Sequence, residues 1–311
     1  MRFLARLRRN LRKRLLFAGM AVLLFFTLCE IAARVGLQVH LERKYGPRLA
    51  EFSESDLVAD KNTGWAWKGQ QLFRARDDVS PGKPTDLFRI IAVGDSCVWG
   101  AMVPPESTFT AKLDRLLKRE YGAARVEVLN SGVVGYGAKQ VAAHVRDKLT
   151  PFKPDLIIYY GTGAEASLWM RGAGVSKAPL LERLHPYLFY SRAFLMLNHA
   201  VRALRPPTPP TAVLTQNDDI TQLQQSCENH GAKLMLAEYL MVEKGIITSD
   251  LARVGDEFNV PVVRTLDTFT EQGRPPRELI FDHEHPTPLG HSLIATKLLD
   301  TIVAAKIIPT P

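Results

Sequence analysis

The chain has 311 residues, of which 46% are hydrophobic, 23% are charged and three are cysteines. This length fits one large domain or two small ones and is ample for a buried core, and the composition excludes wholesale disorder and a disulfide-dense scaffold. The 40 basic residues exceed the 32 acidic ones by eight, but seven of the basic residues and no acid lie in residues 1–14. The other 33 basic residues nearly balance the 32 acidic ones, so the charge argues against nucleic acid as a partner.

A long apolar segment follows this basic tail. Leu15 to Cys29 carries no charge, and apolar residues continue beyond Glu30. As a helix, residues 15–33 would extend about 28 Å, close to the ~30 Å hydrocarbon core of a bilayer. Glu30 and Arg34 have the spacing of a helical ion pair and would lie at the far interface, where charge is tolerated.

We therefore predict a basic cytoplasmic tail at residues 1–14 and a transmembrane anchor at residues 15–37. By the positive-inside rule the rest of the chain faces outward, which in a bacterium means a periplasmic domain on a single pass through the inner membrane. A cleaved signal peptide is one alternative, although charges at Glu30 and Arg34 flank its cleavage site. A buried helix of a soluble protein is the other, and the basic cluster disfavours it.

Residues 38–85 contain several glycines and prolines and show weak periodicity, which predicts an irregular arm. Trp65 and Trp67 lie within it. Such a pair can stack on a sugar ring, but it more often packs an arm onto a neighbouring domain.

The pattern becomes regular from residue 86, where β-rich runs alternate with helical periodicity. Strands are expected at 87–93, 126–129, 155–160, 233–237 and 261–264, and helices at 109–121, 141–149, 220–227, 251–258 and 288–298. Gly122 fits the end of one helix, and Thr287 with Pro288 fits the start of the last. This alternation predicts an α/β domain at 86–311, with a five-stranded parallel sheet covered by helices on both faces. Residues 164–211 interrupt it as an insertion, which ends in a proline-rich connector.

The carboxyl ends of the predicted strands carry the chemistry. Ligands of open α/β sheets bind at that edge. The first strand ends in Gly94-Asp95-Ser96 and the second in Asn130-Ser131-Gly132, and Asp282-x-x-His285 precedes the last helix. A nucleophilic Ser96 needs His285 as base, and Asp282, three residues before it, has the spacing to orient the imidazole. The N–H groups of Ser96 and Gly132 are the candidate oxyanion donors.

Each of these pieces has a plainer interpretation. A Gly-Asp-Ser after a strand is more often only a turn. His283 and His285 suggest zinc, but two histidines with loosely spaced acids are weak support, and we predict no metal site. Cys97 fits a small buried residue below the turn better than a reactive thiol. An exported domain permits a disulfide between Cys97 and Cys227, but nothing in the sequence requires one.

The order of these blocks resembles the SGNH or GDSL-type serine esterases and acyl hydrolases, closely over residues 86–165 and 275–300. The matching residues are Gly94-Asp95-Ser96, Asn130-Ser131-Gly132 and Asp282-x-x-His285. The basic tail with its single helix also resembles membrane-anchored bacterial members. The resemblance implies a flavodoxin-like three-layer αβα sandwich, Ser96 as nucleophile, His285 as general base, Asp282 as its orienting partner, and no cofactor.

One block departs from the family pattern. The third block of the family carries an asparagine whose amide donates to the oxyanion, in a Gly-x-Asn-Asp or Gly-x-Asn-Glu pattern. Here the stretch reads Gly161-Thr162-Gly163-Ala164-Glu165, which leaves Ala164 at the asparagine position. Loss of one oxyanion donor costs about 10²–10³ in rate.

Two hypotheses follow. The first is a membrane-anchored serine esterase that hydrolyses or transfers acyl groups, O-acetyl by family analogy, on a carbohydrate or other small ester outside the cytoplasm. The second is a catalytically impaired protein of the same fold that binds carbohydrate or acts as a scaffold, because Ala164 replaces the third donor.

Overall fold

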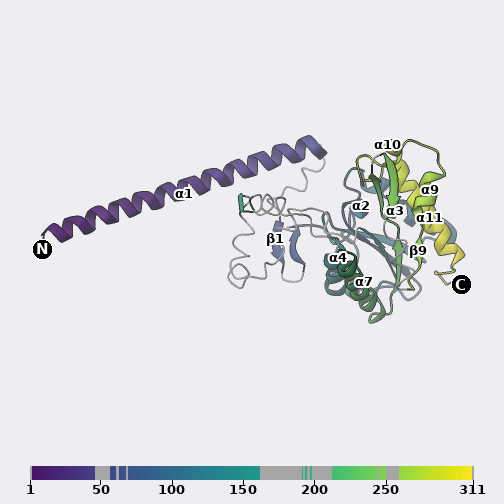
Figure 1. Ribbon diagram of the computed structural model, residues 1–311. Coiled ribbons are helices and arrows are strands. Elements are labelled where there is room, and N and C mark those ends of the chain that lie inside the picture. The colour runs from purple at the N-terminus through teal and green to yellow at the C-terminus, as the bar shows by residue number, and fades with distance from the viewer. Residues whose placement is uncertain are drawn as a thin grey trace. The chain divides into compact units, whose positions relative to one another are not determined.

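The computed structural model (Figure 1) describes residues 2–45, 57–60, 63–67, 69–161, 191, 193–194, 197, 212–243, 245–249 and 259–309. The chain divides into two compact units. One comprises residues 1–59 and 175–206, and the other comprises residues 60–174 and 207–311. The expected helix at 251–258 and most of the expected insertion at 164–211 lie outside the described residues.

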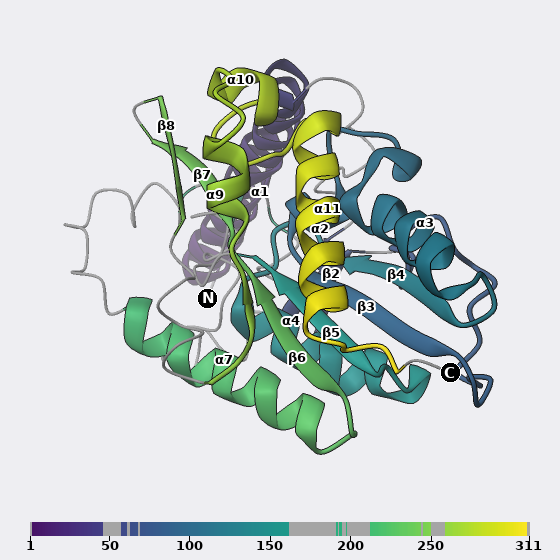
Figure 2. The same cartoon turned by 90° about the vertical axis from the view of Figure 1, so that its right-hand side faces the viewer.

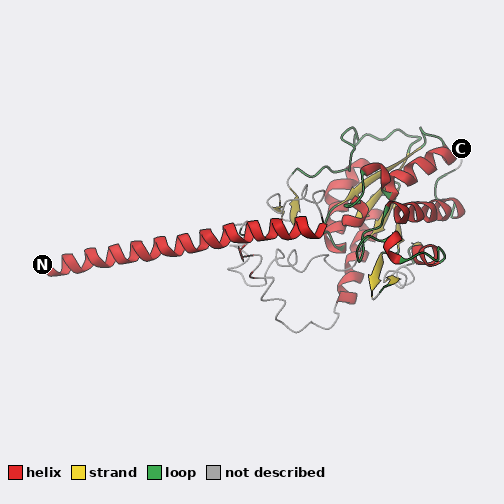
Figure 3. Cartoon of the chain, turned by 90° about the horizontal axis from the view of Figure 1, so that it is seen from above, coloured by secondary structure: helices red, strands yellow, loops and turns green. Residues whose placement is uncertain are grey.

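The first unit contains α1, one continuous helix from Arg2 to Tyr45 (Figure 3). Between Lys13 and Gly36 it is long and apolar enough to cross a membrane, by length and composition alone, with a mean hydropathy of 2.3. Glu30 and Arg34 form the expected ion pair at 2.8 Å. Glu30 Oε2 also accepts hydrogen bonds from Ser191 Oγ at 2.9 Å and from the N–H of Ala193 at 3.0 Å, so this acid joins the helix to part of the insertion.

The second unit is built on a five-stranded parallel sheet of order β4-β3-β5-β6-β9. Its strands are β3 (Phe88–Gly94), β4 (Val126–Gly132), β5 (Leu156–Tyr160), β6 (Lys233–Ala237) and β9 (Val262–Val263). In order of appearance along the chain this is 2-1-3-4-5, the flavodoxin-like arrangement. The predicted fold class is thereby confirmed.

Helices cover both faces of this sheet (Figure 2). The second unit contains α2 (Ser96–Trp99), α3 (Phe109–Tyr121), α4 (Ala138–His144), α7 (Ala212–Glu228), α9 (Thr265–Thr270), α10 (Pro276–Leu279) and α11 (Pro288–Ala304). α3 and α11 pack together on one face, and α4 and α7 pack on the other. Gly122 ends α3, and Thr287 caps α11 with Pro288 as its first residue, as the sequence predicts.

The predicted irregular arm contains regular structure at its start and in its middle. α1 continues to Tyr45, because no glycine or proline interrupts residues 38–45 before Gly46 and Pro47. Two short strands, β1 (Leu57–Asp60) and β2 (Gly64–Trp67), pair with each other. Residues 69–87 contain no helix or strand, and they belong to the second unit.

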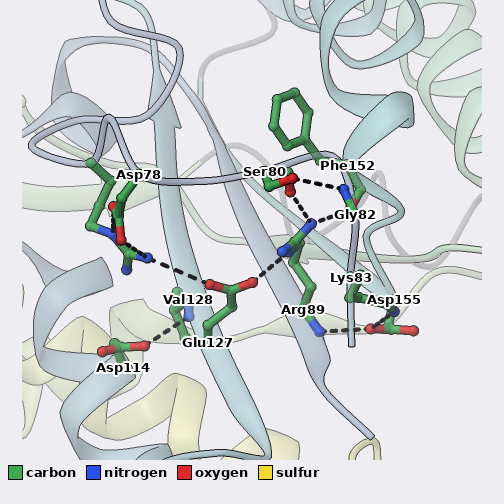
Figure 4. A network of polar contacts seen from close by, with 11 residues as sticks. Asp78, Ser80, Gly82, Lys83, Arg89, Asp114, Glu127, Val128, Phe152 and Asp155 are labelled. Atoms are coloured by element: carbon green, nitrogen blue, oxygen red, sulfur yellow. Dashed lines mark hydrogen bonds and ion pairs between the residues drawn. The ribbon is translucent and has the colours of Figure 1, made fainter. Parts of the chain in front are cut away.

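A polar network joins residues 69–87 to the amino ends of the strands (Figure 4). The buried Arg89 of β3 donates to Glu127 Oε1 of β4 at 2.5 Å and to the carbonyl oxygen of Phe152 at 2.6 Å. Asp155 Oδ2 accepts the N–H of Arg89 at 2.6 Å and pairs with Lys83 Nζ at 2.5 Å. Because a buried guanidinium is costly unless paired, this network holds Arg89 and the arm in one arrangement.

An antiparallel hairpin, β7 (Leu240–Glu243) and β8 (Ile246–Ser249), follows β6 and was not predicted. The N–H of Val242 donates to the carbonyl oxygen of His283 at 2.7 Å. The hairpin therefore supports the loop that carries Asp282 and His285.

Candidate active site

The turn after β3 presents Ser96 at the carboxyl edge of the sheet. A Cβ at Gly94, whose φ is +156°, would lie 1.9 Å from the carbonyl oxygen of Tyr160, so only glycine lets β3 and β5 approach here. Asp95 caps α2 by accepting the N–H of Cys97 at 2.8 Å. Ser96 is then the first residue of α2, where a backbone N–H has no partner within the helix.

Ser96, His285 and Asp282 form a continuous hydrogen-bonded chain. Ser96 Oγ lies 2.8 Å from His285 Nε2, and His285 Nδ1 lies 2.8 Å from Asp282 Oδ2. Because an ionised carboxylate only accepts, Nδ1 carries the proton and Nε2 accepts from the serine hydroxyl. Asp282 Oδ1 accepts the N–H groups of Glu284 and His285, each at 2.9 Å, so the turn itself orients the carboxylate.

The electrostatics of this pair favour an ionised acid beside an imidazole that is more basic than usual. Burial alone would lower the pKa of His285, but the hydrogen bond and charge of Asp282 outweigh it and the pKa is raised. Burial would raise the pKa of Asp282, but the hydrogen bond and charge of His285 hold it well below the usual range. Asp282 is therefore ionised at neutral pH.

The turn after β4 lies against the turn that carries Ser96. A Cβ at Gly132 would lie 2.3 Å from the backbone nitrogen of Trp99, so glycine is required for this approach. Asn130 Nδ2 donates to the carbonyl oxygen of Val98 at 2.7 Å. The N–H of Gly132 donates to Asn130 Oδ1 at 3.1 Å, so this candidate oxyanion donor already has an acceptor.

A buried polar cluster that the sequence did not reveal lies beneath Ser96. Burial and the charge of Glu284 raise the pKa of Asp95 to about 7. Tyr239 Oη donates to Glu284 Oε2 at 3.1 Å and lies 3.1 Å from Cys97 Sγ. Burial and the charge of Asp95 raise the pKa of the Cys97 thiol well above its usual value, so Cys97 is a buried, protonated side chain.

Residues 69–76, here termed the strap, hold both the turn that carries Ser96 and the turn after β4. The sequence analysis did not predict this role. The Arg74 guanidinium donates to the carbonyl oxygens of Trp99, Gly100 and Val103, the last two at 2.8 Å. Gln70 Nε2 donates to the carbonyl oxygen of Gly132 at 3.2 Å. All of these acceptors are backbone atoms, which leave no side-chain pattern in a sequence.

The remaining predictions have mixed outcomes. All three cysteines are free. Thr162 to Glu165 lies outside the described residues, so the structure does not describe Ala164. The part of the chain that is described contains no group of three or more side chains able to hold a metal ion. The side chain of His283 is 55% exposed and takes no part in the hydrogen-bonded chain.

Comparison with known proteins gives similarities among solved structures only, since no family model and no curated protein matches the sequence. A lipolytic protein of the G-D-S-L family from Desulfitobacterium hafniense has a TM-score of 0.43 at 14% identity, covering 68% of this chain and 98% of that one. A catalytic mutant of an acetylxylan esterase from Geobacillus stearothermophilus has a TM-score of 0.44 at 16% identity, covering 74% and 98%. A two-domain esterase active on acetylated mannans has a TM-score of 0.49 at 15% identity, covering 72% and 51%. These similarities concern the fold.

Proposed function

We propose that the second unit is a serine ester hydrolase with Ser96 as nucleophile, His285 as general base and Asp282 as its orienting partner. The single observation that carries this proposal is the unbroken chain of two 2.8 Å contacts from Ser96 Oγ through the imidazole to Asp282. The three residues come from two segments almost 190 positions apart in the sequence, so local turn geometry does not explain their meeting.

The chemistry follows from these atoms. Ser96 Oγ attacks the ester carbonyl carbon while its proton passes to His285 Nε2, and the imidazolium then delivers that proton to the departing alcohol oxygen. Water, deprotonated by the same nitrogen, cleaves the acyl-enzyme, releases the acid and restores the serine. Asp282 stays ionised throughout and stabilises the imidazolium. No cofactor is required for these steps.

The oxyanion donors in this proposal are two backbone groups. The N–H of Ser96, at the start of α2, is the first. The N–H of Gly132 is the second, and it would share its hydrogen between Asn130 Oδ1 and the oxyanion.

We further propose that the substrate is an O-acyl ester, O-acetyl in particular, on a carbohydrate outside the cytoplasm, with transfer to another hydroxyl sharing the same first step. α1 supports an anchored, periplasmic placement, because a basic segment precedes its apolar span. The substrate class rests on the resemblance of the sequence blocks around Ser96 and His285.

The test is hydrolysis of a chromogenic acetyl ester by the full chain in detergent, beside Ser96→Ala. A fall of 10³-fold or more is expected for the variant, since removing one member abolishes the action of all three. Ser292→Ala is a matched control, because the half-buried Ser292 lies on α11 outside the hydrogen-bonded chain, where its Oγ donates to the carbonyl oxygen of Pro288 and accepts from Lys112 Nζ. Equal rates for Ser96→Ala and the unchanged chain would refute the proposal.

A second candidate is a weakly active carbohydrate-binding protein of the same fold. The observation that favours it is the Gly132 N–H, which is already bonded to Asn130. Under this candidate, Ala164→Asn raises esterase turnover at least tenfold while carbohydrate affinity stays constant. Full activity of the unchanged chain, with no gain from Ala164→Asn, would exclude it.

A further inference from the structure

A pocket of about 340 Å³ lies in the second unit outside the hydrogen-bonded chain of Ser96, His285 and Asp282. It is lined by the arm, by the turn after β4 and by α4. Its polar and aromatic lining includes Asp60, Trp67, Gln70, Tyr136, His144 and Asp147. The volume lies in the range of small-molecule sites and is large enough for one sugar ring.

His144 offers this pocket an unprotonated ring nitrogen. Ser131 Oγ donates its only hydrogen to the carbonyl oxygen of Leu72 at 2.8 Å. His144 Nε2, 3.0 Å from the same Oγ, must therefore be the donor in that contact, which leaves Nδ1 as an acceptor. Burial and the charge of Lys148 lower the pKa of His144 to about 4, so the ring is neutral at pH 7.

Gln70 supplies a second acceptor. Its Nε2 donates to the carbonyl oxygen of Gly132, which fixes the orientation of the amide, because a flipped amide would bring two oxygens together. Its Oε1 is buried and has no hydrogen-bond partner among the described residues. A buried acceptor without a donor is unfavourable, so a ligand that donates hydrogen bonds would remove a cost already present in the protein.

The rest of the lining narrows the ligand class. Trp67 and Tyr136 contribute apolar aromatic surface, which suits the C–H face of a sugar ring. Of the charged residues in the lining, Asp147 pairs with Arg146 at 2.7 Å, and Asp60 and Lys148 carry opposite charges. The lining therefore has little net charge, which favours a neutral ring over phosphates and uronates.

We propose that this pocket binds one neutral pyranose ring, whose hydroxyls donate to His144 Nδ1 and Gln70 Oε1. The site is separate from the ester-cleaving residues, and its occupation does not require that Ser96 be active. It gives the protein a means of holding a carbohydrate beside the turn that carries Gly132.

The test uses the full chain with Ser96→Ala, so that binding is measured without turnover. Calorimetric titration with methyl glucoside, methyl mannoside and methyl xyloside, with glucosamine and glucuronate as charged comparisons, is expected to give a Kd of about 1 mM or tighter for at least one neutral glycoside. Glucuronate is expected to bind at least tenfold more weakly. His144→Leu should raise the Kd at least tenfold, and His230→Leu, an exposed histidine after α7, should not.

Because His144→Leu could lose binding simply by misfolding, a second measurement is made on the chain that keeps His144. Addition of the neutral glycoside should shift the ¹⁵N resonance of His144 Nδ1. If the glycoside does not bind in this pocket, that resonance should stay where it is. Absence of both binding and shift refutes the proposal, as does binding that survives His144→Leu. Preference for glucosamine over every neutral glycoside also refutes it, because the carboxylates would then select a cation. The esterase assay on the unchanged chain reports independently on Ser96.

Discussion

Arg74→Met tests whether the strap holds the turn that carries Ser96. Methionine keeps much of the apolar stem and removes the guanidinium that donates to the carbonyl oxygens of Trp99, Gly100 and Val103. The carbonyl oxygen of Gly100 still accepts the N–H of Val103 at 3.1 Å, so the carbonyls of Trp99 and Val103 are the two that lose their donor. Each costs about 1–3 kcal/mol when left without a donor, and because water can reach part of this region we expect a total loss of roughly 2–4 kcal/mol.

Activity should fall as well, since two of these carbonyls lie within four residues of Ser96. A displacement of about 1 Å at a reacting group costs on the order of 10²-fold in rate, and we expect kcat to fall by about that factor with a smaller change in KM. Arg76→Met is the matched control. Its guanidinium pairs mainly with Asp78, whose side chain is 73% exposed, and such surface pairs contribute little to stability.

The assay is thermal unfolding and ester hydrolysis of both variants in the same detergent. The stability loss in Arg74→Met corresponds to a fall of about 10 °C in Tm for a domain of this size. Equal shifts of Tm in the two variants would refute the reasoning, because the contacts to the backbone of the turn that carries Ser96 would then contribute no more than a surface ion pair. An unchanged kcat in a clearly destabilised Arg74→Met would refute the link to catalysis.

Three further outcomes are expected. Asp282→Asn should lower kcat by about 10³–10⁴-fold and move the rising limb of the pH–rate profile to lower pH, because the carboxylate no longer raises the pKa of His285. Asp95 has a native pKa of about 7 against 3.8 for the ordinary group, so the folded chain holds a proton that the unfolded chain releases. Its contribution to stability falls as pH rises from about 4 to 7, by up to about 4 kcal/mol, and Asp95→Asn should remove this fall in melting temperatures measured across that range. Cys97 should resist alkylation at pH 8 in the folded chain and react once the chain is unfolded, as read by mass spectrometry.

The sheet was predictable because its signals are local. Each core strand is a short apolar run, and Gly122 and Thr287 mark helix ends through their own backbone or side-chain preferences. The β7–β8 hairpin was missed although its signal is also local. Glu243 pairs with Ile246 across a two-residue loop, and Gly245 has a φ of +80°, as tight hairpin turns demand. Two β-rich runs around that glycine indicate a hairpin when the loop length is counted.

The sequence was sufficient to predict the hydrogen-bonded chain of Ser96, His285 and Asp282. It was not sufficient to predict the strap contacts that hold the turns of the site. Asp282 and His285 are three residues apart, so one turn brings the carboxylate to the imidazole, and Gly94 and Asp95 shape the turn of Ser96 from its own neighbourhood. The strap contacts span 25 to 62 residues of sequence and end on carbonyl oxygens. Every residue has a carbonyl, so nothing in the sequence identifies which ones need a donor.

The rate of the proposed reaction depends on these strap contacts as well as on the residues of the sequence motif. The parallel sheet brings the turn of Ser96 to the turn of Asp282 and His285, whereas the proposed second oxyanion donor depends on where the turn after β4 places the N–H of Gly132. That position is set partly from outside the motif, since Gln70 holds the Gly132 carbonyl oxygen, while Asn130, within the motif, accepts the N–H. A sequence with an intact set of reacting residues can therefore differ in rate by the 10²–10³-fold that one oxyanion donor contributes. Turnover in this protein should respond to Gln70 about as strongly as to a change in the turn itself.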